Sequence, residues 1–83
     1  MAKNENLRVT IISVERTLFD GEVQALFVPG ERGSFEVLEN HAPIISSLSA
    51  GSIRCVGTTP FEVEISGGFI EVSDNRVNLC VES

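Results

Sequence analysis

The chain has 83 residues, 42% of them hydrophobic and 22% charged, and twelve acidic residues against six basic ones give a net charge of −6. This length and composition predict one folded domain rather than a disordered chain. They argue against a nucleic-acid partner, since the few basic residues are scattered, and against direct membrane insertion, since no apolar run approaches the roughly 20 residues that span a bilayer.

Short apolar runs, separated by turn residues at intervals of about 8 to 12 positions, predict a small all-β sandwich or barrel. In the first run, residues 7–14, alternating apolar residues share one face until Ile12 and Val14 occupy the other. This change predicts either a β-bulge or a strand buried on both faces. The dipeptide Asp20-Gly21 that follows predicts a turn.

Residues 22–29 predict the next strand, which ends at Pro29. Alternation places Val23, Ala25 and Phe27 on one face of it. Residues 30–37 contain two glycines and predict a loop followed by a short strand. The run 43–48 is apolar, and a single helical turn over 43–47 is also considered, because proline is tolerated at the first position of a helix.

Four further strands are predicted in the second half of the chain. They cover residues 52–57, 61–65, 69–72 and 76–81. The clearest is 61–65, where alternate apolar residues point inward and two glutamates face water. Gly67-Gly68 predicts a bulge or a close backbone approach rather than a ligand site. Cys55 and Cys80 lie within strands, and two free buried thiols are expected, with a disulfide between them as the alternative.

His41 is the only histidine, and the sequence allows it to be a catalytic base, a metal ligand or a surface residue. As a base it would need a nucleophile, but neither Ser46 nor Ser47 belongs to a motif such as G-x-S-x-G. A zinc site needs about four ligands, and one histidine with two cysteines falls short. We therefore expect a residue that fixes a loop or meets a partner, and no metal site.

The loop from Gly30 to Gly33 is surrounded by the acidic residues Glu31, Glu36 and Glu39. It lacks the G-K-[ST] ending of a phosphate-binding loop, so a tight surface turn is expected instead. The three glutamates are expected to form a solvated edge that can meet a basic partner, rather than a catalytic acid and base. No catalytic residue and no cofactor are predicted.

Four short motifs follow one another along the chain. They are G-x-x-G at 30–33, HAPI at 41–44, AGSIR at 50–54 and SGGFIEV at 66–72. Each motif alone is weak, whereas their joint order and spacing are specific. They resemble the N-terminal domain of the epsilon-subunit family of F-type ATP synthase, which typically carries G-x-x-G, HAPL or HAPI, a P-G or A-G turn before I-R, and SGGF or SGGI before EV. The resemblance covers nearly the whole chain.

The resemblance implies a flattened β-sandwich of about ten short strands and a non-catalytic rotor subunit. Such a subunit binds the gamma subunit of the central stalk and touches loops of the membrane c-ring, which couples ion translocation to ATP synthesis elsewhere. It is peripheral on the cytoplasmic face of the bacterial inner membrane, and this chain is expected to bind no nucleotide. A free-standing β-sandwich interaction module of another assembly is the alternative.

The resemblance also assigns surface residues. Positions that match the gamma-facing surface are Ser13, His41 and Ser46, and those that match the c-ring loop are Glu31, Arg32, Gly33, Ser34 and Glu36. The family often has an acid directly after the second glycine of this loop, where this chain has Ser34. Family members commonly continue with a C-terminal pair of helices. This sequence ends at Ser83, so a single domain over 1–83 without a helical domain is expected.

Overall fold

The computed structural model describes residues 6–82, and these residues form nine β-strands and no helix. In chain order the strands are β1 (Leu7–Ile12), β2 (Thr17–Val23), β3 (Ala25–Gly30), β4 (Gly33–Val37), β5 (Ile44–Leu48), β6 (Gly51–Val56), β7 (Phe61–Ile65), β8 (Gly67–Ser73) and β9 (Arg76–Glu82). The prediction of an all-β chain is confirmed. Within this range there is no helix of the length and apolarity needed to cross a membrane.

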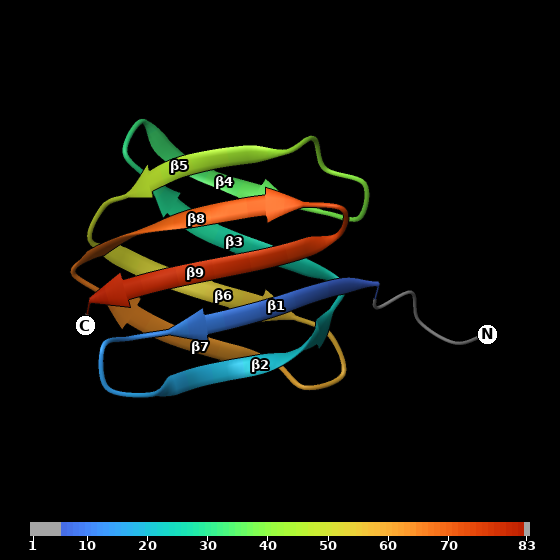
Figure 1. The fold of residues 1–83 in the computed structure, drawn as a ribbon, viewed down its shortest axis with the longest axis horizontal. Coiled ribbons are helices and arrows are strands. Elements are labelled where there is room, and N and C mark those ends of the chain that lie inside the picture. Colours follow the sequence, from blue (N-terminus) through green and yellow to red (C-terminus); the bar gives the residue numbers. More distant parts are fainter. Residues whose placement is uncertain (1–5, 83) are drawn as a thin grey trace.

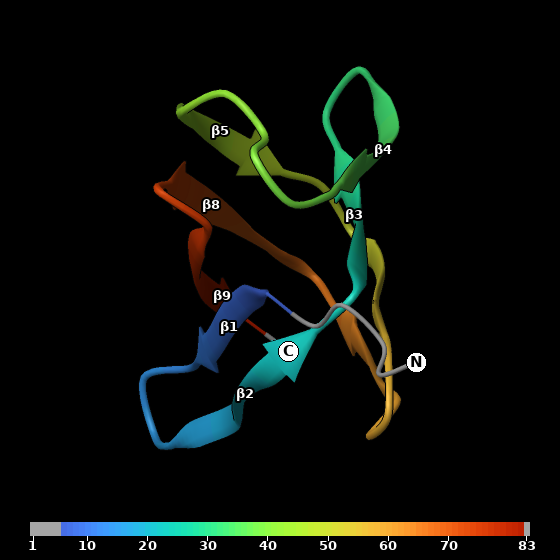
Figure 2. The ribbon, with the colours of Figure 1, turned by 90° about the vertical axis from the view of Figure 1, so that its right-hand side faces the viewer.

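The strands form two layers that lie face to face (Figure 1). One layer has the order β2-β1-β9-β8-β5 and the other has β4-β3-β6-β7, and Figure 2 shows them from the side. Neighbouring strands are antiparallel except for β1 and β9, which run parallel. The two layers are joined where Gly30 of β3 pairs with Leu48 of β5. The fold is the predicted β-sandwich, flattened to 38 × 24 × 18 Å.

The core lies between the two layers, and the side chains buried there are apolar throughout residues 6–82. Successive residues of a strand point to opposite faces, so each strand can present one apolar row inward. The largest side chains with less than 2% exposure are Leu7, Val9, Ile11, Val23, Leu26, Val28, Val37, Ile53, Ile70, Val72, Val77 and Leu79. The inward row predicted for 61–65 is confirmed, since its apolar members are buried or pack against this core. Val77, Leu79 and Val81 of the strand predicted at 76–81 form a second buried row.

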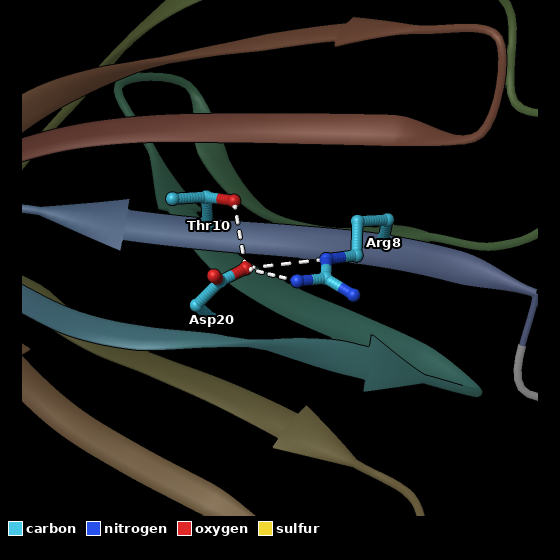
Figure 3. A network of polar contacts seen from close by, with 3 residues as sticks. All are labelled: Arg8, Thr10 and Asp20. Carbon is cyan, nitrogen blue, oxygen red and sulfur yellow. Dashed lines mark hydrogen bonds and ion pairs between the residues drawn. The ribbon is translucent and has the colours of Figure 1, made fainter.

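The prediction of a turn at Asp20-Gly21 is wrong, because both residues lie inside β2. β2 pairs with β1, and Asp20 lies directly opposite Thr10. The Asp20 carboxylate accepts hydrogen bonds from the Arg8 guanidinium at 2.7 Å and from the Thr10 hydroxyl at 3.3 Å (Figure 3). The turn preference of a D-G pair is local, and pairing with a neighbouring strand overrides it here.

The strand predicted at 22–29 is two strands in the structure, separated by Gln24. The chain passes here from one layer to the other, so the alternation of inward and outward residues starts again. As a result Leu26 and Val28 are the fully buried residues of β3. The prediction that Val23, Ala25 and Phe27 share one face is wrong, because Val23 is buried in the core whereas Phe27 is half-buried under the exposed Arg54.

The helical turn considered over 43–47 does not form, because residues 44–48 are the strand β5. β5 pairs with β8 along its whole length. Its two adjacent isoleucines, Ile44 and Ile45, favour this extended backbone, since β-branched side chains are restricted in a helix and pack well on a sheet.

A register shift lies near the place where the β-bulge was predicted, and the alternative of a strand buried on both faces is wrong. Ile11 pairs with Phe19 and Ile12 pairs with Thr17, so the extra residue, Leu18, lies in β2 and not within residues 7–14. Ile12 is 37% exposed, and Val14, which follows β1, is 98% exposed. The first strand therefore buries one face, and two large apolar side chains lie at the surface where it ends.

Gly68 makes the close backbone approach that the Gly67-Gly68 pair predicts. Its φ is +153°, and a Cβ atom on it would collide with the carbonyl oxygen of Cys80 and lie 2.9 Å from the Cα atom of Val81. A Cβ atom on Gly67 would instead lie 3.8 Å from the carbonyl oxygen of Leu48, which is an ordinary contact. Only glycine at position 68 lets β8 lie this close to β9.

We expect Gly68→Ala to lower the free energy of unfolding by about 2 kcal/mol or more, because it combines a clash with β9 and an unfavourable backbone angle. Gly67→Ala is the matched control and should change that free energy by less than about 1 kcal/mol. Urea unfolding followed by circular dichroism measures both variants. Equal stability of the two would contradict the close approach.

Candidate interaction surfaces

The tip of the β3–β4 hairpin is a tight turn, in which Gly30 pairs with Gly33 and only Glu31 and Arg32 lie between them. The exposed residues of the tip are Glu31, Arg32, Gly33 and Ser34. The Phe35 ring fills the space beside Gly30, where a Cβ atom would lie 2.9 Å from the ring and 2.7 Å from the Gly33 carbonyl oxygen. The tip is therefore compact, and its four exposed residues lie close together.

Ser49 braces the base of this hairpin from the connection between β5 and β6. Its backbone N–H donates to the carbonyl of Pro29 at 2.8 Å, and its hydroxyl donates to the same oxygen at 3.3 Å. At Gly51 the backbone also approaches closely, since a Cβ atom there would lie 2.7 Å from the Cβ atom of Pro29. The hairpin tip thus projects from one end of the sandwich on a fixed base (Figure 1).

Glu36 follows the tip along β4. It is exposed on the outer face of this strand, opposite Phe27 of β3, and the Arg54 guanidinium lies over the Phe27 ring at 4.6 Å. Ser34 and Glu36 are two residues apart in β4, so they point to the same face at a spacing of about 7 Å. The other four residues predicted for the c-ring contact lie together at the tip, and Glu36 continues their exposed surface along β4.

His41 is half-buried in the connection between β4 and β5, and it makes two hydrogen bonds within this loop. Its backbone N–H donates to the Leu38 carbonyl at 3.2 Å, and its Nδ1 lies 2.8 Å from the Ala42 carbonyl oxygen, to which it donates. Asn40, with a φ of 68°, anchors the loop by donating its backbone N–H to the Asn75 side chain at 2.6 Å. These contacts fit the interpretation of His41 as a residue that fixes a loop.

Ser13 and Ser46 hydrogen-bond within their own segments. Ser13 follows β1, where its backbone N–H donates to the Arg16 carbonyl at 2.9 Å and its hydroxyl accepts the Glu15 N–H at 3.3 Å. Ser46 is half-buried in the middle of β5, and its hydroxyl donates to the Ser47 carbonyl at 3.3 Å. A nucleophile would donate to the ring of its base, whereas the Ser13 and Ser46 hydroxyls each donate to a backbone carbonyl of their own segment.

The three residues predicted to face gamma are spread along one layer. Ser13 follows the last residue of β1. The beginning of this strand lies beside Asn75, because the Asn75 carbonyl accepts the Arg8 N–H at 2.9 Å. Asn75 also holds the loop of His41. Ser13 and His41 therefore lie at opposite ends of the layer, and Ser46 lies between them on β5.

An apolar groove on the outer face of this layer was not predicted from the sequence. It encloses about 410 Å³, and its lining includes Ile12, Ser13, Val14, Phe69, Cys80 and Glu82. Phe69 is 52% exposed and shares the outer face of β8 with Glu71. The sequence FIEV at 69–72 indicates that Phe69 is exposed, because strict alternation puts this phenylalanine on the same face as the glutamate.

The two cysteines are free and lie in different environments. Cys55 is buried in the core, and burial raises the pKa of its thiol to about 11. Cys80 is half-buried on the outer face of β9, where it lines the apolar groove. The prediction of two free thiols is confirmed, and the prediction of burial holds for Cys55. Across residues 6–82, no group of three His, Cys, Asp or Glu side chains could hold a metal ion.

Comparison with known proteins gives a consistent result. Residues 6–83 match the family described as ATP synthase, Delta/Epsilon chain, beta-sandwich domain. The chain is 42% identical over 77 residues to the ATP synthase epsilon chain of Leptospira borgpetersenii, and this alignment covers 92% of this chain and 61% of that protein. It is 36% identical over 74 residues to the ATP synthase epsilon chain of Chlorobaculum tepidum, covering 87% of this chain and 84% of that protein.

The chain spans about three fifths of the length of the Leptospira relatives. Its fold is similar to that of a chain in the cryo-EM structure of the Euglena gracilis mitochondrial ATP synthase, OSCP/F1/c-ring. The TM-score is 0.86 at 20% identity, and the match covers 100% of this chain and 54% of that one. At this identity the likeness concerns the fold alone.

We expect iodoacetamide at pH 8 to modify Cys80 and to leave Cys55 unmodified in the folded chain. At a pKa of about 11, roughly one Cys55 thiol in a thousand is ionised at pH 8, and the thiolate is the reactive form. Mass spectrometry of tryptic peptides separates the two sites. Prior unfolding in urea should make both cysteines reactive, and equal rates in the folded chain would contradict the burial of Cys55.

Proposed function

Because the chain belongs to the ATP synthase Delta/Epsilon chain family, we propose that it is a non-catalytic rotor subunit of the central stalk. In this role it links the gamma subunit to the c-ring. Ion translocation through the membrane is thereby coupled to ATP synthesis at catalytic sites on other subunits. The relatives named for the ATP synthase, and a similar fold within an F1/c-ring structure, support this role.

The observation that carries the proposal is the presence of two separate candidate surfaces on one braced sandwich. The hairpin tip with Glu31 and Arg32 projects from one end, and the outer face of the β2-β1-β9-β8-β5 layer offers a second, larger surface. A subunit that transmits rotation must hold two partners in a fixed relation, which favours contacts mounted on strands and tight turns. This chain meets that requirement with strands alone over the described range.

The tip is proposed to meet the c-ring through polar contacts. Glu31 is the acid at the tip, since Ser34 stands directly after the second glycine and Glu36 lies farther along the exposed face of β4. A carboxylate in this position suits basic partner loops, and the net charge of −6 favours such partners. We propose that the chain stays peripheral at the cytoplasmic face of the bacterial inner membrane, held there by these contacts.

No nucleotide is proposed as a ligand of this chain. The loop at 30–33 joins two antiparallel strands, whereas a phosphate-binding loop leads into a helix whose N-terminus faces the phosphate. The glycines of this loop are explained by the tight turn and by the Phe35 ring beside it.

A pull-down with the tagged chain from a detergent-solubilised bacterial membrane extract tests the proposed function. Recovery of the gamma subunit together with the c-subunit supports the link. Recovery of a different assembly without either of them would favour a free-standing interaction module and overturn the proposal.

Crosslinking at the tip tests the c-ring side. Cysteine introduced as Ser34→Cys should crosslink to a c-subunit loop in the assembled enzyme, because Ser34 is exposed at the projecting turn. Glu62→Cys, on the exposed face of β7, is the control and should give no c-subunit product. A Ser34 variant that crosslinks to gamma alone would contradict the assignment of this tip.

Replacement of the histidine tests the gamma side. We expect His41→Ala to lower the free energy of unfolding by at most about 1 kcal/mol, since one hydrogen bond within a surface loop is lost. Affinity for gamma should fall, because the ring lies on the proposed contact surface. Thermal unfolding and binding to purified gamma are measured side by side. A large loss of stability with unchanged affinity would mean that the histidine has a structural role only.

A further inference from the structure

We propose that the open edge of β7 is a docking site for an extended segment of a partner protein in which basic and apolar residues alternate. The segment adds to the β4-β3-β6-β7 layer as one more strand. Its basic side chains lie beside Glu62 and Glu64, and its apolar side chains lie beside Phe61 and Val63. The inference does not depend on the proposed contacts with gamma and the c-ring.

The backbone of β7 is paired on one side, because β7 is the last strand of its layer (Figure 1). It pairs with β6 in regular antiparallel register, from Phe61 opposite Cys55 to Ile65 opposite Gly51. In such a pair the N–H and C=O groups of alternate residues point to the neighbouring strand, so those of the other residues point to the open side. A row of donors and acceptors of this kind can pair with an added strand.

Most of the features that usually prevent strand addition are missing from β7. Edge strands are commonly protected by proline, by a β-bulge or by charges that point inward. The run FEVEI at 61–65 contains no proline, its pairing with β6 is regular, and its inward residues are apolar. The protection that remains is the negative charge of Glu62 and Glu64 on the outer face. This charge repels an acidic strand and attracts a basic one, so it selects the partner.

The charges of Glu62 and Glu64 are available to a partner. Both side chains are exposed, and within residues 6–82 neither takes part in an ion pair. Arg54 lies opposite Glu62 in β6, but its guanidinium lies over the Phe27 ring at 4.6 Å. Glu64 accepts a hydrogen bond from the Ser52 hydroxyl at 2.9 Å, which holds its carboxylate on the outer face. Lysine or arginine directly opposite these carboxylates on an added strand would stabilise the pairing.

The inner side of the same edge is apolar and only partly covered. Phe61 and Val63 of β7 are half-buried, as are Leu18 and Phe19 of β2, the last strand of the opposite layer. The Phe19 and Phe61 rings pack across the gap between the layers, with their centroids 5.0 Å apart. A strand added beside β7 would cover these side chains further, and the burial of its own apolar residues would stabilise the contact.

Other occupants and the other open edge fit less well. A second copy of this chain that paired β7 with β7 would bring two pairs of carboxylates onto one face, where they repel one another. The edge of β2 has an irregular register, and its Asp20 carboxylate is already paired with Arg8. The net charge of −6 attracts a basic segment over a longer range.

Two synthetic peptides of equal composition and charge test the inference on the full chain. In acetyl-Lys-Val-Lys-Val-Lys-amide the lysines share one face of an extended strand, whereas in acetyl-Lys-Lys-Val-Val-Lys-amide both faces are mixed. The alternating peptide should bind about tenfold more tightly than the rearranged one. An NMR titration of the isotope-labelled chain measures both affinities, and the amide signals of β7 should shift and exchange more slowly with solvent.

Charge reversal on β7 should reverse the preference. Glu62→Lys combined with Glu64→Lys should weaken binding of the alternating lysine peptide about tenfold or more, and should create binding of acetyl-Glu-Val-Glu-Val-Glu-amide. Glu15→Lys combined with Glu71→Lys is the matched control. It changes the net charge equally at exposed positions away from β7, and should leave the affinity within about threefold. Circular dichroism melting curves check that both double variants fold.

Three results would overturn the inference. The first is equal binding of the two lysine peptides, which would mean attraction by net charge alone. The second is a shift of amide signals that centres on β2 instead of β7. The third is unchanged binding after charge reversal at Glu62 and Glu64. Each would leave the proposed function standing, because the experiment uses neither gamma nor the c-subunit.

Discussion

The packing of two small sheets against each other is the interaction on which the rest of this structure depends. The strands have only five to seven residues each, and each presents a single apolar row toward the opposite layer. Neither layer could remove its apolar side chains from water alone, and a chain of this size buries only about 60% of the surface that it exposes when unfolded. Every strand therefore contributes to one shared core, from Leu7 in β1 to Val81 in β9.

Close packing of short strands also accounts for the glycines that punctuate the sequence. At Gly68, Gly30 and Gly51 an added Cβ atom would meet backbone or side-chain atoms of a neighbouring strand at less than van der Waals distance. These positions hold β8 against β9, shape the tip of the β3–β4 hairpin, and press the β5–β6 connection onto β3. The glycine motifs are thus required by the packing of the backbone, and no bound phosphate is needed to explain them.

The core lies between the two layers, so the side chains on the two outer faces do not contribute to it and can differ in character. On the β4-β3-β6-β7 layer, Arg54 stacks on Phe27 with acidic residues on the flanking strands. The other outer face is divided in two. One part is polar and includes Arg8 and Asp20 (Figure 3), and the other is the apolar groove around Phe69. Partner contacts can vary on these faces without any change to the residues that stabilise the fold.

Features that depend on near neighbours along the chain were predictable from the sequence. They include the all-β class and the inward rows of β7 and β9, because alternation is a local property. The order of the motifs also predicted the family correctly. Other features depended on contacts between distant segments. Pairing with β1 holds Asp20-Gly21 extended, the crossing at Gln24 restarts the alternation in β3, and the joining of Ile12, Cys80 and Phe69 builds the groove. Strand pairing between distant segments decides which outward side chains become neighbours, and a local pattern carries no record of that pairing.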